Sequence, residues 1–466
     1  MKPGIDEHTA TTSSLDLELI RKYSIAGPRY TSYPPATRFE AGVERSALLA
    51  AIARDNASAD APLSLYFHLP FCKSLCYYCG CNSIITKNPI AAIEYLGDLA
   101  REVALVRPLM NRARPVRQVH LGGGTPTFLT PEELGILGRL IRDNFTLADD
   151  CEFGVEIDPR CLDEAQVAAL KAIGANRASL GVQDTNPDVQ LAIHRRQPDD
   201  LNRRAVDWLR GAGFTSINFD LIYGLPLQTR DSFLRTIDDV LELHPDRLSV
   251  FSYAHVPWIR PAQRQFERRH QLCTPEEKLA IFAAGHERLL GAGFIDIGLD
   301  HFARPDDELA IAQREGTLQR NFQGYSTAAG ASLYGFGVSS ISSTEDSYRQ
   351  SHKTLEDWRR DIAAGALPVE RGLILTEDDR RRRAIIMHLM CDRRVDYAAL
   401  SRQLGIDVTG YFAAEISGLL DLEADGLLRR TETGIEMLPR GFPLLRVAAM
   451  RFDATAAPAG RHSMTV

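Results

Sequence analysis

The sequence predicts an α/β fold, a partial or full barrel of six βα units followed by a smaller, mainly helical C-terminal domain. Between Leu63 and about Arg304, short β-rich runs alternate with helical stretches, which is typical of parallel βα units. Beyond about Leu367 the pattern changes to helices without interleaved strands, with short β-like pieces only near 427–437. The change in pattern therefore predicts two structural parts.

The strands and helices of the first part have clear local signals. The six candidate strands are 63–69, 116–122, 151–158, 176–183, 216–223 and 247–254. Two intervening helices begin with a Thr N-cap, a Pro at the first helical position and a Glu three residues after the cap, at Thr130 and at Thr274. A further cap is expected near Thr376, where the C-terminal helices start.

Side chains along each strand alternate between an apolar and a polar face. In the third strand, for example, Phe153 and Val155 oppose Glu152 and Glu156. In an α/β barrel the apolar faces pack against the helices, so we expect the polar faces to line the interior. Catalytic groups of such barrels collect at the C-terminal strand ends. Those ends hold the cysteine loop described below, Gly122–Gly124, Glu156, Gln183, Asp220 and Ala254.

Composition limits the function classes. The 466 residues are 44% hydrophobic and 25% charged, as in ordinary globular proteins. A net charge of -7 argues against nucleic-acid binding through overall positive potential. No apolar run approaches the ~18 residues of a membrane span, so we expect no membrane association and a cytoplasmic location. The expected division is a 1–55 arm with a first helix, a 56–365 barrel, a 366–450 helical domain and a 451–466 tail.

The most informative motif is the cysteine triplet Cys72, Cys76 and Cys79, spaced CxxxCxxC. Iron–sulfur clusters are held by cysteine thiolates, usually four, so a triplet leaves one iron open for chemistry. Cys81 is predicted not to be a ligand, because it lies only two residues past Cys79 and an open iron must remain. A structural zinc site would need a second, separated pair of ligands, and the sequence has none. The alternative to a cluster site is that the triplet is a chance group of buried cysteines. The other cysteines are scattered singly, at Cys151, Cys161, Cys273 and Cys391.

Other motifs allow two interpretations. Gly122-Gly123-Gly124-Thr125-Pro126 could bring its backbone close to a ligand or be a plain βα turn. Glu156 and Asp220 could bind a ligand or form ion pairs with arginines such as Arg177 and Arg195. The run 380–383 of four arginines is better explained by a solvated helical face than by a nucleic-acid patch. His301 is more often a satisfied barrel histidine than a ligand.

Read together, these segments resemble oxygen-independent coproporphyrinogen III oxidases of the radical S-adenosylmethionine (SAM) superfamily. The CxxxCxxC triplet specifies only the superfamily. The family is indicated by Arg29-Tyr30-Thr31-Ser32-Tyr33-Pro34, Cys79-Gly80-Cys81-Asn82 and His301-Phe302-Ala303-Arg304-Pro305. The segments that carry the resemblance are 27–34, 66–72, 79–82, 122–127, 218–226, 249–255 and 300–308, and the match runs from about residue 15 to 450.

The resemblance implies a partial (β/α)6 barrel with a [4Fe-4S] cluster and SAM, two SAM molecules in this family. It implies the oxidative decarboxylation of two propionates of coproporphyrinogen III to vinyl groups, giving protoporphyrinogen IX in haem biosynthesis. A 5'-deoxyadenosyl radical would abstract the unactivated β-hydrogen. The implied partners are the porphyrinogen and a reducing donor such as flavodoxin or ferredoxin, with the chain a monomer. The alternatives are a radical SAM haem chaperone or haem-utilisation protein on the same scaffold and, in another class, a DNA-binding iron–sulfur regulator.

The resemblance also implies residue roles. Cys72, Cys76 and Cys79 would hold the cluster, and a catalytic role is assigned to Glu156. The first SAM would contact Tyr66, Gly123, Glu156 and Ile341, and the second Tyr78, Gly124, Thr125, Gln183, Arg195, Asp220 and Ala254. Tyr78 stands where the family often has Phe, which keeps the stacking face and adds a hydroxyl. We further expect Arg29, Tyr30 and Tyr33 to contact the substrate, although this arm could merely pack on the barrel.

Overall fold

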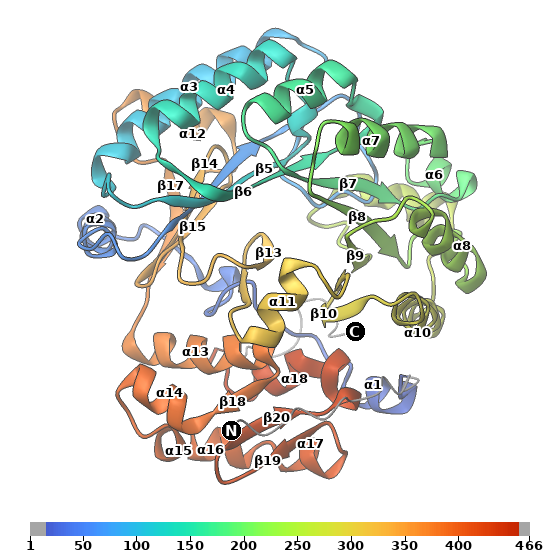
Figure 1. The fold of residues 1–466 in the computed structure, drawn as a ribbon, viewed down its shortest axis with the longest axis vertical. Coiled ribbons are helices and arrows are strands. Elements are labelled where there is room, and N and C mark those ends of the chain that lie inside the picture. Colours follow the sequence, from blue (N-terminus) through green and yellow to red (C-terminus); the bar gives the residue numbers. More distant parts are fainter. Residues whose placement is uncertain (1–14, 456–466) are drawn as a thin grey trace.

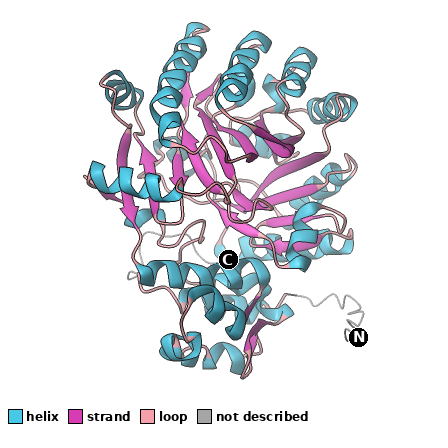
Figure 2. Ribbon diagram, turned by 60° about the vertical axis from the view of Figure 1, so that its left-hand side comes forward, coloured by secondary structure: helices cyan, strands magenta, loops and turns pink. Residues whose placement is uncertain are grey.

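The computed structural model describes residues 15–455, and a curved 13-stranded sheet is its largest element. All six predicted strands are present and parallel, in sequence order across the centre of this sheet. They are β2 (Leu63–Leu69), β5 (Val116–Gly123), β6 (Leu147–Ile157), β7 (Arg177–Gln183), β8 (Ser216–Tyr223) and β9 (Arg247–Ser252). The sheet curves into an incomplete barrel with strands inside and helices outside (Figures 1 and 2).

The sheet extends beyond these six strands on both edges. A seventh parallel strand, β14 (Ser332–Phe336), pairs with β2. Antiparallel strands continue that edge in the order β15 (Ile341–Ser343), β16 (Ser347–Ser351), β17 (Val369–Ile374) and β1 (Glu40–Ala41). The other edge carries β11 (His301–Ala303) and β10 (Ile295–Gly298). We expected only helices beyond Leu367, so β17 corrects that expectation: the helical part begins after Ile374.

The apolar outer faces of the strands pack against helices, as the alternation predicts. The covering helices include α3 (Ile90–Val106), α4 (Pro131–Asn144), α5 (Glu164–Ala172), α7 (Asp199–Gly211), α8 (Arg230–Leu241) and α10 (Pro275–Gly291), with α2 (Arg45–Asp55) and α12 (Leu355–Ala363) beside the β14–β17 edge. Both predicted capping boxes are confirmed, since Thr130 and Thr274 accept from the backbone of Glu133 and Glu277. None of the helices in residues 15–455 is long and apolar enough to cross a membrane.

The polar faces line the interior and are joined by hydrogen bonds across neighbouring strands. Ser64 Oγ donates to Gln118 Oε1 at 2.9 Å, and Gln118 Nε2 donates to Glu152 Oε1 at 2.9 Å. Glu152 in turn pairs with Arg177 Nε at 3.0 Å. Glu152 lies in the middle of β6 and Arg177 begins β7, so this chain of polar side chains crosses the interior away from the C-terminal strand ends.

Short elements fill the loops around the barrel. They are β3 (Phe71–Cys72), β4 (Ile84–Ile85), α6 (Pro187–Ala192), α9 (Arg264–Arg269), α11 (Glu308–Glu315) and the hairpin β12 (Gln319–Asn321) and β13 (Gly324–Ser326). In Figure 1, α11 and β13 lie at the open side of the barrel, between the barrel and the C-terminal helices. The open side is therefore covered by segments from outside the βα repeat.

The C-terminal part has its own hydrophobic core and a small antiparallel sheet. Its helices are α13 (Glu377–Asp392), α14 (Tyr397–Leu404), α15 (Val408–Tyr411), α16 (Ala413–Ser417), α17 (Leu420–Ala424) and α18 (Leu445–Met450), and its strands are β18 (Arg394–Asp396), β19 (Leu428–Arg430) and β20 (Gly434–Met437). The four arginines of α13 are not simply solvated. Arg380 pairs with Asp346, and Arg383 donates to the carbonyls of Thr344 and Glu345, so α13 is tied to the β15–β16 turn.

The tyrosines of the N-terminal arm pack into this C-terminal core, while Ile20 packs against the core of the barrel. Helix α1 (Leu17–Tyr23) opens the arm. Tyr30 and Tyr33 are fully buried in the core, and Tyr30 Oη donates to Asp453 Oδ2 at 2.9 Å. Tyr33 Oη accepts from the backbone N–H of Ala454 at 3.2 Å. These hydrogen bonds therefore join the N-terminal arm to the C-terminal end of the described chain.

Candidate active site

The cysteine loop follows β2 at the C-terminal end of the parallel sheet, where the sequence predicts it. Gly124 N donates to Leu69 O at 2.8 Å and Thr125 N donates to Phe71 O at 2.9 Å, so the glycine motif after β5 lies directly against this loop. A Cβ on Gly124 would come within 2.5 Å of Phe71 O and 2.6 Å of Pro70 O. Only glycine fits there without displacing backbone, so the motif is more than an ordinary βα turn.

The three thiols of the triplet are free, and Cys76 is held by two arginines. Arg160 Nη2 donates to Cys76 Sγ at 3.4 Å, and Arg195 Nη1 reaches the same sulfur at 3.6 Å. Asp158 Oδ2 orients both arginines, at 2.7 Å from Arg160 and 3.0 Å from Arg195. Two guanidinium groups therefore lie beside this sulfur, and both are fixed by the same carboxylate.

The other two thiols of the triplet differ in environment. Burial, with the nearby Cys79 and Cys76 thiols as a second cause, raises the pKa of Cys72 to about 12. A hydrogen bond from the Cys81 thiol outweighs burial and lowers the pKa of Cys79 to about 6. Cys81 N also donates to Cys79 Sγ at 3.4 Å. Cys81 thus lies against Cys79, where it can donate to a sulfur without itself binding iron.

This arrangement fits a [4Fe-4S] cluster. Each thiolate of such a cluster binds a different iron, so the three sulfurs need not converge on one point. Among residues 15–455 no three His, Cys, Asp or Glu side chains converge as they would on a single metal ion. Three free cysteines that do not converge on one point therefore fit a cluster better than a mononuclear zinc site, which needs four converging ligands.

Glu156, at the end of β6, contacts the glycine motif. Its Oε2 accepts from Gly123 N at 3.0 Å, and its Oε1 lies 3.2 Å from His120 Nε2. Burial would raise the pKa of Glu156, but these hydrogen bonds and the neighbouring His120 hold it below its usual value. The side chain is nevertheless 41% exposed, so an ionised carboxylate opens into the barrel interior. Its partners are a backbone amide and a histidine, so Glu156 forms no ion pair with the described arginines.

Tyr66 and His68, on the polar face of β2, link the strand to the cysteine loop. His68 Nε2 hydrogen bonds to the Asn82 carbonyl at 2.9 Å, and a carbonyl only accepts. Nε2 therefore carries the proton, and Nδ1 accepts from Tyr66 Oη at 3.0 Å. Burial lowers the pKa of His68, which keeps the ring neutral. The Tyr66 ring also stacks on His120, with 6.0 Å between the ring centroids.

Asp220 and Arg195 continue the site across β7 and β8. Asp220 accepts from Ser179 Oγ and from Asn218 Nδ2, each at 2.8 Å, while burial raises its pKa to about 6. Arg195 Nη2 donates to Gly181 O at 2.5 Å, and its Nε is buried without a hydrogen-bond partner among the described residues. Gln183, at the end of β7, has a left-handed backbone with φ of 72°. Asp220 makes no ion pair with the described arginines, whereas Arg195 pairs with Asp158.

Tyr78 and Ala254 are brought together by a residue that the sequence did not indicate. Gln263 Nε2 lies 3.2 Å from both the Tyr78 and the Ala254 carbonyls. Its Oε1 accepts from Val256 N at 2.6 Å. Ile341, at the start of β15, lies on the opposite flank, where a Cβ on Gly335 would come within 2.6 Å of its carbonyl. Ile341 therefore lies on the β14–β15 side of the sheet, whereas Ala254 follows β9 on the other side.

Tyr30 and Tyr33 do not join this group. Both hydroxyls are engaged with the C-terminal segment, and both rings are buried, so their expected contact with a substrate is not supported. Arg29 is different, because its side chain remains 33% exposed while it pairs with Asp300. Burial, followed by the charges of Arg320 and Arg446, lowers the pKa of Arg29 to about 9. These three arginines form a positive region.

Sequence reasoning also missed Asp158 and Arg160. Both residues lie close to Cys76 only in the folded chain, and no spacing rule connects either of them to that cysteine.

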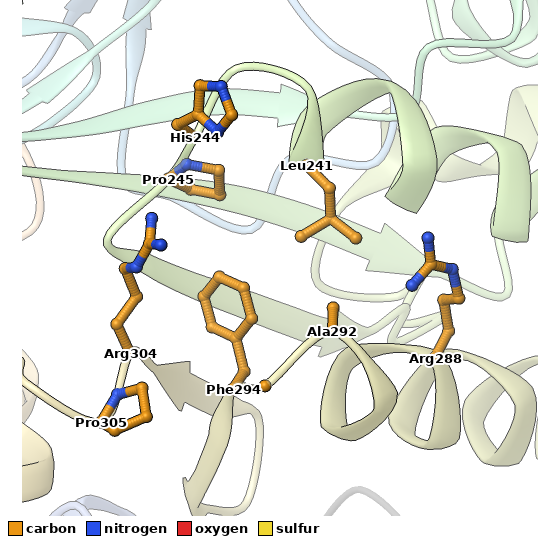
Figure 3. Close-up of a pocket in the computed structure, with 9 residues that line it drawn as sticks. Leu241, His244, Pro245, Arg288, Ala292, Phe294, Arg304 and Pro305 are labelled. Carbon is orange, nitrogen blue, oxygen red and sulfur yellow. The ribbon is translucent and has the colours of Figure 1, made fainter.

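A pocket of about 500 Å³ lies elsewhere, lined by residues that include Leu241, His244, Phe294 and Arg304 (Figure 3). Leu241 ends α8 and Phe294 precedes β10, so this pocket faces the N-terminal strand ends. It contains none of the candidate site residues.

Comparison with known proteins places these features in a family. Residues 66–240 match the model of the radical SAM superfamily, and residues 375–444 match that of the HemN C-terminal domain. The first match contains the cysteine triplet, the glycine motif and Glu156. The second begins at Leu375, two residues before the start of α13 at Glu377.

Full-length relatives are named oxygen-independent coproporphyrinogen III oxidase. The protein from Synechocystis is 45% identical over 96% of this chain and 96% of its own length, and that from Pseudomonas aeruginosa is 46% identical over 94% and 95%. The solved structure of coproporphyrinogen III oxidase (HemN) from Escherichia coli, described as a radical SAM enzyme, superposes with a TM-score of 0.89 at 43% identity, covering 95% of this chain and all of that one. The chain therefore belongs to the oxygen-independent coproporphyrinogen III oxidase family of the radical SAM superfamily.

Proposed function

We propose that this protein converts coproporphyrinogen III to protoporphyrinogen IX without oxygen, by oxidative decarboxylation of two propionates. The observation that carries the proposal is the free cysteine triplet held against the glycine motif and Glu156 at the C-terminal strand ends. The names of the full-length relatives support this activity over the haem-chaperone alternative. The chain also keeps Cys81 and the N-terminal arm, which the chaperones usually lack.

The proposed cofactors are a [4Fe-4S] cluster on Cys72, Cys76 and Cys79 and SAM on its open iron. When bound, the cluster and SAM would supply the radical chemistry needed to remove an unactivated β-hydrogen, and the propionate would then lose carbon dioxide and pass one electron to an external acceptor to become a vinyl group. Glu156, ionised and open to the interior, is suited to accept from ribose hydroxyls of SAM. Tyr66, Gly123 and Ile341 would complete this first SAM site.

A second SAM is proposed beside the first, on Tyr78, Gly124, Thr125, Gln183, Arg195, Asp220 and Ala254. Two observations support it. Arg195 Nε is a buried donor without a partner among residues 15–455. Asp220 keeps a carboxyl group at the end of β8 whose described partners are only Ser and Asn side chains. Equilibrium dialysis of the reconstituted protein should therefore find two SAM molecules per cluster, and Arg195→Gln should reduce the number to one.

The substrate carries four carboxylates, and we propose that Arg29 contacts one of them. Its guanidinium is partly exposed within the positive region of Arg29, Arg320 and Arg446. A planar guanidinium suits a carboxylate because two parallel N–H groups can donate to it. Arg29→Gln should raise the KM for the porphyrinogen and leave SAM affinity unchanged.

The reaction needs an external one-electron reductant, and a flavodoxin or ferredoxin is the proposed donor. We propose that the chain acts as a monomer in the cytoplasm, where a reducing environment keeps the thiols of the triplet available for iron. Gel filtration and reduction by purified flavodoxin test these two statements separately.

Anaerobic incubation with coproporphyrinogen III, SAM and a reductant tests the function. The protein should release two carbon dioxide molecules per porphyrinogen and form two vinyl groups, and Cys76→Ala should form none. Binding of haem without any decarboxylation would favour the chaperone alternative instead.

A further inference from the structure

A small cavity lies on the helix-covered side of the sheet, at the β14–β17 edge and away from strands β6–β9. It has a volume of about 30 Å³ and lies between strands β14–β17 and helices α2 and α3. Its polar lining includes Arg349 and Ser351 of β16, Ser342 of β15 and Glu102 of α3. None of these four residues has a part in the proposed reaction.

Arg349 places a buried guanidinium at this cavity, where Tyr334 and Asp55 are the neighbouring groups that favour its charged form. Its side chain belongs to a residue only 6% exposed, it forms no ion pair with the described residues, and its Nη1 is buried without a hydrogen-bond partner. The guanidinium lies over the ring of Tyr334, 5.1 Å from its centroid. Asp55 is near but already pairs with Arg114 at 2.8 Å and accepts from Tyr334 Oη at 2.8 Å.

Two hydroxyl groups accompany this guanidinium. Ser351 is 7% exposed, and its Oγ is buried without a partner among the described residues. Ser342 stands opposite Arg349 in the β15–β16 register, so their side chains share one face of the sheet. Ser342 Oγ accepts from Gly335 N at 3.0 Å, which leaves its own O–H available to donate. The cavity therefore offers donors from three residues.

Glu102, the acidic residue among these four, does not balance the charge. Its Oε2 accepts from Gly337 N at 2.6 Å, and it forms no ion pair with the described residues. Burial raises the pKa of Glu102 to about 7, so a large fraction is protonated near neutral pH. An unpaired buried charge is costly, because the lost hydration must be replaced by other groups.

We propose that this cavity binds one monovalent anion of halide size, such as chloride, between the Arg349 guanidinium and the Ser342 and Ser351 hydroxyls. The donor set and the net positive charge exclude a cation. The small accessible volume of about 30 Å³ favours a small anion over a bulky one. The bound anion would join β15 to β16 and stabilise the strand that carries Ile341.

Thermal unfolding of the full-length protein carrying its cluster tests this site. At constant ionic strength, replacing gluconate by chloride should raise the unfolding temperature in a saturable way, because a ligand that binds only the folded state stabilises it. Bromide should act like chloride. Arg349→Gln should abolish this anion-specific increase, whereas Arg360→Gln should retain it, since the Arg360 side chain is 61% exposed and does not line the cavity.

Crystals grown in bromide provide a second measurement that does not depend on how Arg349→Gln folds. An anomalous peak within hydrogen-bond distance of Arg349 and Ser351 is the expected result. Water at this position, with equal unfolding temperatures in chloride and gluconate, would overturn the proposal. An anion effect that Arg360→Gln loses as completely as Arg349→Gln would also overturn it, because the effect would then be general screening.

Discussion

Substitution of Glu156 tests whether the end of β6 holds SAM. Glu156→Ala removes the acceptor of Gly123 N and the partner of His120 Nε2, and with them the proposed acceptor of the ribose hydroxyls. Glu156→Gln keeps a neutral oxygen in the same place. We expect both variants to assemble the cluster, because no cysteine of the triplet bonds to Glu156 in residues 15–455.

The expected magnitudes follow from the charge of the acceptor. A hydrogen bond to a charged group contributes about 1.5 to 3 kcal/mol, so Glu156→Ala should weaken SAM binding roughly 10- to 150-fold. A neutral acceptor is about half as strong, so Glu156→Gln should weaken it by roughly 1 kcal/mol, or about fivefold. The order of the three affinities is therefore wild type, then Gln, then Ala.

Equilibrium dialysis of SAM on anaerobically reconstituted protein measures these affinities, while visible absorption monitors the cluster. Glu152→Gln is a matched control on the same face of the same strand. Glu152 pairs with Arg177 and Gln118 below the strand ends, so its substitution should lower stability and leave SAM affinity unchanged. Wild-type affinity in Glu156→Ala would refute the assignment, and equal losses in both positions would show a general structural effect.

Three further predictions concern the cluster, pH and the arm. Cys72→Ala, Cys76→Ala and Cys79→Ala should each lose the visible cluster absorption, whereas Cys81→Ser should retain it; a cluster-free Cys81→Ser beside a cluster-bearing Cys79→Ser would reverse the ligand assignment. Burial raises the folded-state pKa of Glu102 to about 7, above the unfolded value of 4.5. The contribution of protonated Glu102 to the free energy of unfolding is therefore complete below pH 4.5 and is lost as pH rises through 7. The loss amounts to at most roughly 3 kcal/mol. Glu102→Gln should flatten this loss in denaturant titrations between pH 5 and 8, and an unchanged pH dependence would contradict the burial argument. Tyr30→Phe leaves the buried Asp453 Oδ2 without its donor and should cost about 1 to 3 kcal/mol of unfolding free energy with unchanged SAM cleavage; lost cleavage at normal stability would return Tyr30 to the active site.

The central strands could be predicted because their signals are local. Alternating side chains and capped helices defined the six parallel strands to within a few residues at most ends. Strands β14 to β17 could not be predicted in this way, because they are short and the first of them, β14, joins the sheet through a distant partner. Ser332 pairs with Leu63 across most of the barrel domain, and only the folded chain brings them together.

The residues of the site likewise fall into those that local patterns identify and those that only the folded chain brings together. The cysteine triplet, Gly124 and Glu156 were predictable because spacing and strand ends identify them. Gln263 and Arg160 act through a carbonyl and a sulfur that are distant in sequence, so no motif indicates them. The packing of Tyr30 and Tyr33 could not be predicted, because a Tyr-rich arm looks the same in sequence whether its rings pack in a core or contact a ligand.

Transfer of deuterium tests the central claim most directly. Coproporphyrinogen III deuterated at the β-carbons of the two reacting propionates should be incubated anaerobically with the protein, SAM and a reductant. We predict one deuterium in the 5'-deoxyadenosine released for each vinyl group formed, because hydrogen abstraction and decarboxylation occur at the same propionate. Vinyl formation with unlabelled 5'-deoxyadenosine, or SAM cleavage without any vinyl product, would contradict the account.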